Sequence, residues 1–369
     1  FPEFMKDWEE HALAEYLDFK NGLNPDVKRI GRGLPFISVM DILADGTINN
    51  DSIRGKVEAT EREIENFSVE KGDILFQRSS ETLEDVGRAN VYMDNRTAVY
   101  GGFVIRGRKI GDYNPLFFKY LLSTPLARKR TCRMGAGAQH FNIGQDGLSK
   151  ISLCFPLMEE QNKIARLLSL IDERIATQNK IIDKLQSLIK GLRVCCMQRN
   201  GSNNVYLSEI AQIYQPQTIS SAELTEDGFL VYGANGIIGK YKDYNHKTEQ
   251  ICITCRGNTC GMVNYTKPMS WITGNAMVIN TDKYQDKVYK KYLYHYLSAY
   301  NFNSIISGSG QPQIVRTPLE KLKITLPTIS EQKQKAMILD KVQDKIEINH
   351  NILNLYILQK QYLLRQMFI

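Results

Sequence analysis

The chain has 369 residues, of which 43% are hydrophobic, 24% charged and 9% aromatic, which predicts two or three globular domains and excludes disordered and fibrous proteins. The 47 basic and 40 acidic side chains give a net charge of +7, which permits a nucleic-acid partner without requiring one. The seven cysteines are irregularly spaced, which predicts reduced thiols in a cytoplasmic protein and no disulfides. No apolar run reaches the roughly 18 residues of a membrane span, and the acidic, aromatic beginning predicts no signal peptide.

Short runs of strand-forming residues, separated by Gly, Asn and Ser, predict two mixed α/β segments. The predicted strands are residues 36–42, 73–77 and 98–105 in the first segment and 229–232, 250–254 and 276–280 in the second. A long helical pattern follows each segment. The sequence therefore predicts four parts, at residues 1–155, 156–199, 200–327 and 328–369.

The chain repeats itself with a period of about 171 residues. The pattern Pro-x3-Glu-Gln occurs at residues 156–161 and again at 327–332, each time between a short strand and a long helix. An aromatic helix and a Gly-rich loop precede both copies in the same order, and outside these elements the two segments share little. A copied scaffold with divergent loops suits a protein in which two sites read different things.

The two long helices carry heptad patterns that predict a coiled coil of roughly 50 Å. The predicted seams are Ile164, Leu168, Ile171, Ile175, Ile182, Leu185, Ile189 and Leu192, and then Leu339, Val342, Ile346, Leu353, Tyr356 and Leu363. Gln178 and Asn349 are polar residues near the midpoints of these seams. In an antiparallel pair they would face each other and fix the register at a cost in stability. Lys335 and Lys360 interrupt the second seam.

Motifs for catalysis and metal binding are absent in convincing form. The loop at 233–240 lacks the spacing of a phosphate loop, and the five histidines form no evident triad. Cys252, Cys255 and Cys260 lack a fourth zinc ligand, and strand alternation places Cys252 and Cys255 on opposite faces as packed thiols. We therefore expect a chain that is not an enzyme and that holds no metal or cofactor of its own.

Two variable α/β segments, each followed by a strand, Pro-x3-Glu-Gln and a heptad helix, resemble the specificity subunit of type I restriction-modification systems over essentially the whole chain. Residues 71–76, 232–239 and 308–314 add to the resemblance. It implies two α/β target-recognition domains separated by two long antiparallel coiled-coil helices. Each domain would read one half of a bipartite target in double-stranded DNA, and the helices would set the spacing.

The resemblance also implies partners. Two methyltransferase subunits would dock on the helices, and restriction subunits would join through them. S-adenosylmethionine would belong to the methyltransferase, and ATP and Mg to the restriction subunit. The outer helix faces are candidates for docking, at Arg166, Arg174, Lys184 and Arg193, although a solvated face explains them equally well.

Base reading requires exposed side chains that offer hydrogen-bond donors and acceptors from loops. The candidates in the first domain are Arg78, Ser79, Ser80, Arg88, Gln139, His140 and Asn142. The candidates in the second are Tyr232, Asn235, Arg256, Asn258, Thr259, Gln311, Gln313 and Arg316. The alternative interpretation of these Gly- and Asn-rich loops is that they only permit backbone turns.

Charge by itself does not single out a DNA-binding face. Residues 1–155 hold 21 basic and 22 acidic side chains, a net of −1. DNA contact would therefore come from local clusters, namely Arg78 with Arg88 and Arg96, residues 106–109 and residues 128–133, with further phosphate contacts from the methyltransferases. A coiled-coil adaptor without sequence-specific DNA binding is the alternative function, and a single-chain DNA enzyme is a third.

Overall fold

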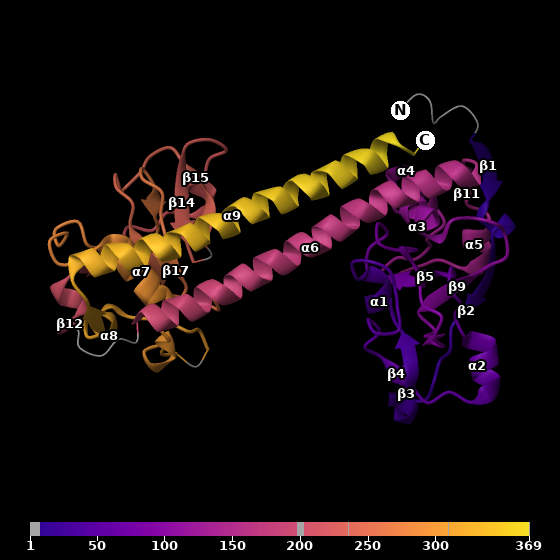
Figure 1. The fold of residues 1–369 in the computed structure, drawn as a ribbon, viewed down its shortest axis with the longest axis horizontal. Coiled ribbons are helices and arrows are strands. Elements are labelled where there is room, and N and C mark those ends of the chain that lie inside the picture. The colour runs from indigo at the N-terminus through magenta and orange to yellow at the C-terminus, as the bar shows by residue number, and fades with distance from the viewer. Residues whose placement is uncertain (1–7, 198–202, 235, 309, 369) are drawn as a thin grey trace. The chain divides into compact units, whose positions relative to one another are not determined.

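The computed structural model describes residues 8–197, 203–234, 236–308 and 310–368. The chain divides into two compact units: unit 1 holds residues 1–179 and 352–369, and unit 2 holds residues 180–351. Figure 1 labels the elements of both. Across the described residues, no helix combines the length and apolar character that crossing a membrane requires.

Unit 1 is a mixed α/β unit. Its strands are β1 Glu9–Ala12, β2 Leu17–Asn21, β3 Ile30–Ile37, β4 Lys56–Val57, β5 Ile74–Gln77, β6 Ser79–Ser80, β7 Ala89–Val91, β8 Val99–Tyr100, β9 Val104–Lys109, β10 Phe141–Asn142 and β11 Ser152–Phe155. Its helices are α1 Val39–Leu43, α2 Glu61–Phe67, α3 Pro115–Ser123, α4 Pro125–Cys132, α5 Gln145–Ser149 and the first part of α6 Met158–Met197. The larger sheet has the order β2-β9-β5-β7 and a smaller one the order β4-β3-β8.

Unit 2 repeats this plan. Its strands are β12 Asn203–Tyr206, β13 Gln212–Tyr214, β14 Phe229–Gly233, β15 Gly236–Tyr241, β16 Ile251–Thr254, β17 Val263–Tyr265, β18 Trp271–Ile272, β19 Ala276–Asn280 and β20 Lys323–Leu326. Its helices are α7 Lys290–Ala299, α8 Arg316–Glu320 and the first part of α9 Ile329–Gln366. The sheet orders β13-β19-β16-β17 and β15-β14-β18 match those of unit 1 strand for strand.

The predicted antiparallel helix pair is confirmed within each unit. In unit 1, Leu168 and Ile171 of α6 share a core with Leu363 of α9, and Asp172 Oδ1 lies 2.5 Å from Lys360 Nζ. In unit 2, Ile189 of α6 packs with Leu339 and Ile346 of α9. Further along unit 2, Arg193 contacts Gln343 and Cys196 contacts Lys335, so rising numbers along α6 meet falling numbers along α9 and the pairing is antiparallel.

The lysines that interrupt the second seam have partners inside their units. Lys360 pairs with Asp172 and lies 5.5 Å from the centre of the Tyr120 ring. Lys335 Nζ donates to the carbonyl of Cys196, near the carboxyl end of α6, at 2.8 Å. A cation near a helix carboxyl terminus is favourable because the carbonyl dipoles point outward there.

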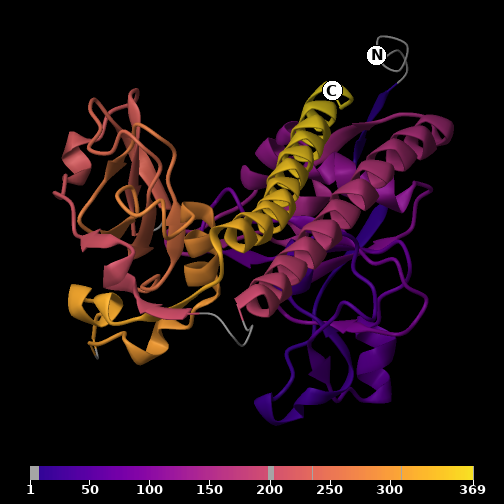
Figure 2. The same cartoon turned by 60° about the vertical axis from the view of Figure 1, so that its left-hand side comes forward.

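The aromatic helices, α3 in unit 1 and α7 in unit 2, pack against the parts of the long helices that belong to their own unit. Asn114 caps α3 by accepting from the backbone of Leu116 and Phe117 at 2.9 and 3.0 Å, and Pro115 fits the first turn because its missing N–H has no partner there. The Phe117 ring then stacks on Phe368, with ring centres 5.5 Å apart. In unit 2, α7 lies against the start of α9 (Figure 2), where His295 Nε2 and Asp340 Oδ1 are 2.9 Å apart.

Two strand predictions were wrong in part. The predicted strand at 36–42 ends at Ile37. Helix α1 begins at Val39, where the Asp41 carboxylate accepts from the backbone N–H of Ser38 at 2.7 Å and from its hydroxyl at 2.8 Å. The predicted strand at 98–105 is two strands, β8 and β9, with a turn between them. The other four predicted strands are confirmed as β5, β14, β16 and β19.

The repeat also extends further than the sequence indicates. Residues outside the repeated motifs share little sequence, yet the two units have the same sheet orders and the same strand directions at corresponding pairings. Strand pairing depends on alternating apolar residues and backbone hydrogen bonds, so it tolerates replacement of the individual side chains.

Candidate nucleic-acid interface

One end of the larger sheet in unit 1 brings together three of the predicted base readers. The chain leaves β5 through Arg78 into β6, which pairs antiparallel with β10. Ser79 lies opposite Asn142, and its hydroxyl donates to Oδ1 of Asn142. The backbone N–H of Ile143 donates to the carbonyl of Arg78 at 3.0 Å, which locks the two segments together.

The Gly-rich loop before β10 is a closed backbone frame. Ala136 and Asn142 exchange two backbone hydrogen bonds, each 2.9 Å long. Gly137 has a φ of 146°, and a Cβ there would lie 1.9 Å from the carbonyl oxygen of His140. Only glycine fits that position. The frame leaves Gln139 and His140 exposed at its tip.

Unit 2 builds the same frame from different residues. Ser307 and Gln313 exchange backbone hydrogen bonds of 2.9 and 2.8 Å. Gly308 has a φ of 94°, and a Cβ there would lie 2.4 Å from the carbonyl oxygen of Gln311. Arg256 pairs with Gln313, as Ser79 does with Asn142. The two residues that close the frame are 136 and 142 in unit 1 and 307 and 313 in unit 2. Each residue of the second pair follows its counterpart by 171 positions.

The frames are equivalent in their backbones and differ in the side chains they present. Unit 1 presents Ser79 and Asn142 at the strand pairing, where unit 2 presents Arg256 and Gln313. Gln311, Gln313, Arg256 and Asn258 are all exposed. These are side-chain types whose donors and acceptors match base edges.

Other predicted readers lie in different surroundings. Arg88 Nη2 lies 2.6 Å from Asp85, and Arg316 Nε lies 2.6 Å from Glu320. Ser80 is half-buried in β6, and its hydroxyl accepts from the backbone of Thr82 at 3.3 Å.

Two further predicted readers, Tyr232 and Thr259, lie at the end of β14. Tyr232 is buried in a small core, where its hydroxyl accepts from the backbone of Lys267 at 3.1 Å. Thr259 donates to the carbonyl of Ala234 at 2.9 Å. Asn235 lies outside the described residues. The ring of Tyr232 is therefore shielded from solvent, and the Thr259 hydroxyl holds the backbone that follows β14.

Most of the predicted basic clusters are engaged inside unit 1. Arg96 lies 2.8 Å from Asp51 and 2.7 Å from Asp94. Arg106 is buried and donates to the carbonyl of Ser68 at 2.7 Å. These arginines therefore form ion pairs and hydrogen bonds that stabilise unit 1 itself.

Buried glutamines of the repeated motif position the aromatic helices. Gln161 Oε1 accepts from the backbone of Asn114 at 3.0 Å, while its Nε2 donates to the carbonyl of Pro156 at 3.0 Å. Gln332 makes the same two contacts, with Tyr289 at 2.8 Å and Pro327 at 2.9 Å. The sequence predicts the repeated motif but not this role of its glutamine, although a glutamine at the same place in two copies of a repeat is a signal for it.

The predicted register pair remains a prediction. Gln178 is buried, and Asn349, half-buried, donates from Nδ2 to the carbonyl of Lys345 at 2.6 Å. These two residues belong to different units.

No cluster of three or more His, Cys, Asp or Glu side chains with metal-binding geometry occurs among the described residues. Cys252 and Cys255 pack into different cores, which confirms their predicted opposite faces. Burial raises the pKa of the Cys252 thiol to about 12, so this thiol stays protonated and is a packing residue.

The comparisons with known proteins agree with this architecture. The family described as "Type I restriction modification DNA specificity domain" matches residues 5–187 and 200–355. The type I restriction enzyme MjaVIII specificity subunit of Methanocaldococcus jannaschii is 25% identical over 93% of this chain and 88% of its own length. The EcoprrI specificity subunit of Escherichia coli is 32% identical over 37% of this chain and 34% of its own length.

Two solved structures share the fold. The S subunit of the type I system from M. genitalium aligns with a TM-score of 0.67 and 16% identity over 98% of this chain and 96% of its own. A chain from a structure of type I complex assembly and conformational transition aligns with a TM-score of 0.58 and 14% identity over 98% of both chains.

Proposed function

The chain belongs to the family of type I restriction-modification specificity subunits, and we propose that its two units each read one half of a bipartite, asymmetric target in double-stranded DNA. The chain acts as the non-catalytic recognition subunit of a larger complex in the cytoplasm. The gap between the two half-sites is not read.

The observation that supports this proposal most is the pair of equivalent loop frames. Unit 1 closes its frame between Ala136 and Asn142, and unit 2 closes its frame between Ser307 and Gln313. The backbone is the same while the exposed side chains differ. Two different half-sites require such a pair, because the backbone sets the position of a reader and the side chain sets its specificity.

The side chains give each frame a chemical preference. Asn and Gln match the donor and acceptor pattern of adenine, and Arg matches that of guanine. Arg256 beside Gln313 in unit 2 therefore favours a half-site with guanine and adenine, and Asn142 in unit 1 favours adenine.

The long helices set the distance between the half-sites in this proposal. α6 has 40 residues and α9 has 38, which makes each about 60 Å long at about 1.5 Å per residue. Each helix has residues in both units. Removing one heptad from each helix, at 176–182 and 347–353, keeps the seam in phase and shortens the pair by about 10 Å, or about three base pairs.

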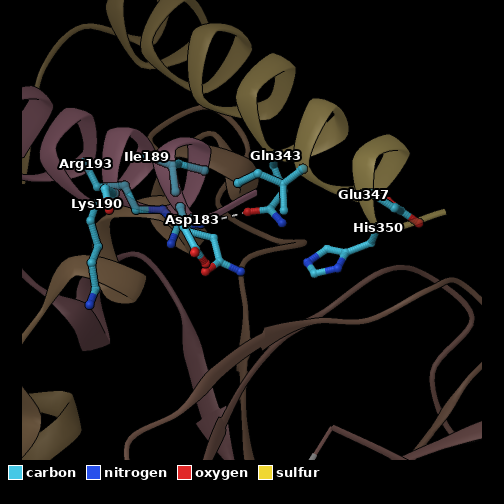
Figure 3. Close-up of a pocket in the computed structure, with 10 residues that line it drawn as sticks. Asp183, Ile189, Lys190, Arg193, Gln343, Glu347 and His350 are labelled. Atoms are coloured by element: carbon cyan, nitrogen blue, oxygen red, sulfur yellow. Dashed lines mark hydrogen bonds between the residues drawn. The ribbon is translucent and has the colours of Figure 1, made fainter. Parts of the chain in front are cut away.

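The same helices carry the docking faces for two methyltransferase subunits. In unit 2, a hollow of about 670 Å³ lies between α6 and α9, where Arg193 Nη2 donates to Gln343 Oε1 at 3.3 Å (Figure 3). Lys190, Glu347 and His350 also line it. Exposed apolar residues on the same part of the helices include Leu188 and Ile348. Exposed apolar side chains rimmed by charges are typical of protein interfaces.

The cofactors belong to those partners. S-adenosylmethionine is placed in the methyltransferase subunits, and ATP and Mg in restriction subunits that join through them.

The test is the methylation pattern of a host that carries this chain and its methyltransferase. We expect one bipartite adenine-methylated motif. The double substitution Ser79→Ala and Asn142→Ala should relax only one half of the motif, and Arg256→Ala should relax only the other. The heptad deletion should change the gap between the halves and leave both sequences unchanged.

Three outcomes contradict the proposal. Failure to co-purify with a methyltransferase contradicts the docking role, and an unchanged gap after the heptad deletion contradicts the spacer role. Binding to scrambled half-sites as tight as to the motif favours the alternative, an adaptor without sequence-specific DNA binding.

A further inference from the structure

The turn between β8 and β9 lies at the same end of unit 1 as the Gly-rich frame. Val104 N donates to the carbonyl of Gly101 at 2.9 Å, and Gly101 N donates to the carbonyl of Ile37 at 2.9 Å. The N–H of Arg78 donates to the carbonyl of Phe103 at 2.9 Å. Phe103 is therefore held next to the segment that carries Ser79 and pairs with Asn142.

Unit 2 contains the same turn at residues 273–276. Ala276 N donates to the carbonyl of Thr273 at 3.0 Å, and Thr273 N donates to the carbonyl of Tyr232 at 2.9 Å. The N–H of Cys255 donates to the carbonyl of Asn275 at 3.0 Å. Asn275 thus occupies in unit 2 the position that Phe103 occupies in unit 1, and its side chain is exposed.

Phe103 is an unusual residue for an exposed turn. It keeps 68% of its surface exposed, although a phenylalanine side chain gains stability from burial. Met40, which is 75% exposed, lines the same hollow of about 420 Å³. Arg78 Nη1 lies 3.3 Å from the carbonyl of Gly102, beside Phe103. The Arg78 guanidinium therefore binds the backbone of the turn that carries the exposed Phe103 side chain.

We infer that this turn is a specificity-determining position in both units: Phe103 contacts the 5-methyl group of a thymine, and Asn275 hydrogen-bonds an adenine. The inference rests on the proposed reading of DNA half-sites. Thymine is the one standard DNA base with a methyl group in the major groove, and phenylalanine is among the side chains that contact it. Asparagine matches the N6 donor and N7 acceptor of adenine.

The position favours a base over a protein partner. The turn is tied by a backbone hydrogen bond to the strand end that carries Ser79 in unit 1 and Arg256 in unit 2. A ligand that reaches those side chains therefore also reaches the turn. The difference between Phe103 and Asn275, on equivalent backbones, is a difference in which base edge the turn can contact.

The test uses the full chain in complex with its methyltransferase and duplexes that carry the mapped motif. In the half-site relaxed by the Ser79→Ala and Asn142→Ala pair, each thymine is replaced in turn by deoxyuridine, which lacks the methyl group. One replacement should weaken binding about fourfold, the value expected for one buried methyl group. In the other half-site, replacing one adenine by 7-deazaadenine should weaken binding about fivefold to a hundredfold.

The variants assign these effects to the two turns. Phe103→Ala should bind the thymine and deoxyuridine duplexes equally well, and Phe103→Asn should do the same. Asn275→Ala should lose its response to 7-deazaadenine and keep the response to deoxyuridine. Ile110→Ala is the matched control, since Ile110 is 60% exposed and follows β9 at the end of the strand opposite to Phe103. It should keep both responses.

The possible failures are distinct. If the complex shows no sequence preference, the proposed function itself fails. If it recognises a bipartite motif but no deoxyuridine changes binding, or if the first half-site contains no thymine on either strand, the inference about Phe103 is overturned. Retention of the deoxyuridine effect by a folded Phe103→Ala variant overturns it as well. Thermal unfolding of each variant shows that it is folded.

Discussion

Unit 1 and unit 2 have the same backbone plan and hold their aromatic helices to the long helices with different chemistry. In unit 1, Tyr120 Oη donates to Asp172 at 2.8 Å, and Lys360 neutralises that carboxylate. In unit 2, His295 stands in place of Tyr120 and contacts Asp340 and Arg193. The pairing of strands and helices has been kept in both copies, while the polar groups that connect them have changed.

This comparison shows which contacts the repeat depends on. The buried glutamines of the two copies make the same two hydrogen bonds, and the glycines of the two loop frames have the same function. The polar groups under the aromatic helices vary because several combinations can satisfy a half-buried site.

The largest expected effect is the loss of stability when a buried glutamine of the repeated motif is replaced. Gln332→Leu leaves the backbone groups of Tyr289 and Pro327 without their partners in a buried site, and we expect a loss of about 2–6 kcal/mol in the free energy of unfolding. Gln161→Leu should cost unit 1 a similar amount. Urea denaturation measures both.

Gln334→Leu is the control for this pair, because Gln334 is exposed on the same helix. A small effect of Gln332→Leu, equal to that of the control, would show that the glutamines do not hold the helices.

The next largest effect is on the loop frames. Gly308→Ala places a Cβ 2.4 Å from a carbonyl oxygen at a positive φ, so the loop must change shape. We expect specific DNA binding by the complex to fall roughly a hundredfold, with relaxed sequence in the half-site of unit 2 only. Gly310→Ala is the control in the same loop, since a Cβ there meets no atom within 4 Å. Equal binding by the two variants would contradict the role of the frame.

A smaller loss of stability, with a different salt dependence in each unit, is expected when the polar groups beneath the aromatic helices are replaced. Lys360→Met leaves Asp172 without its cation, and since both side chains are about one-quarter exposed we expect a loss of about 1 kcal/mol. The loss should shrink in high salt. Arg193→Met removes hydrogen bonds to His295 and Gln343, which are neutral groups, so its effect should depend less on salt. Urea denaturation at two salt concentrations distinguishes the pair.

The smallest effect is a dependence on pH that belongs to unit 2. Burial lowers the pKa of His295 below its ordinary value of 6.5, so the folded protein keeps this imidazole neutral where the unfolded chain takes up a proton. Stability should therefore be complete above about pH 6.5 and should fall as the pH drops below it. His295→Gln should reduce this acid-side loss, whereas Tyr120→Phe in unit 1 should leave it in place. Thermal midpoints at pH 7.5 and 5.5 provide the measurement.

The sequence predicted the parts of the fold that local periodicity encodes. The heptad seams led to the long antiparallel helices, and an aromatic helix was predicted before each copy of the repeated motif. The positions of the Gly-rich loops were predicted as well, because glycine is required where the chain turns with positive φ. The pairing of Ser79 with Asn142, and of Arg256 with Gln313, was not predicted, since it joins segments that lie more than fifty residues apart in the chain.

The turns that carry Phe103 and Asn275 were not predicted from the sequence either. The Gly101-Gly102 pair is a turn signal inside a run of strand-forming residues, and the strand pattern outweighed it. The exposure of Phe103 could not be predicted either, because a phenylalanine between two strands is expected in a core.

The repeat, the length and phase of the helices and the family resemblance all follow from residue spacing, so they can be read along the chain. Which side chains share one end of each sheet, and that Tyr232 is buried, become known from the folded structure alone. It also revealed that the two units have one sheet order beneath dissimilar sequences. Those facts depend on long-range backbone hydrogen bonds, which many different side chains can accompany.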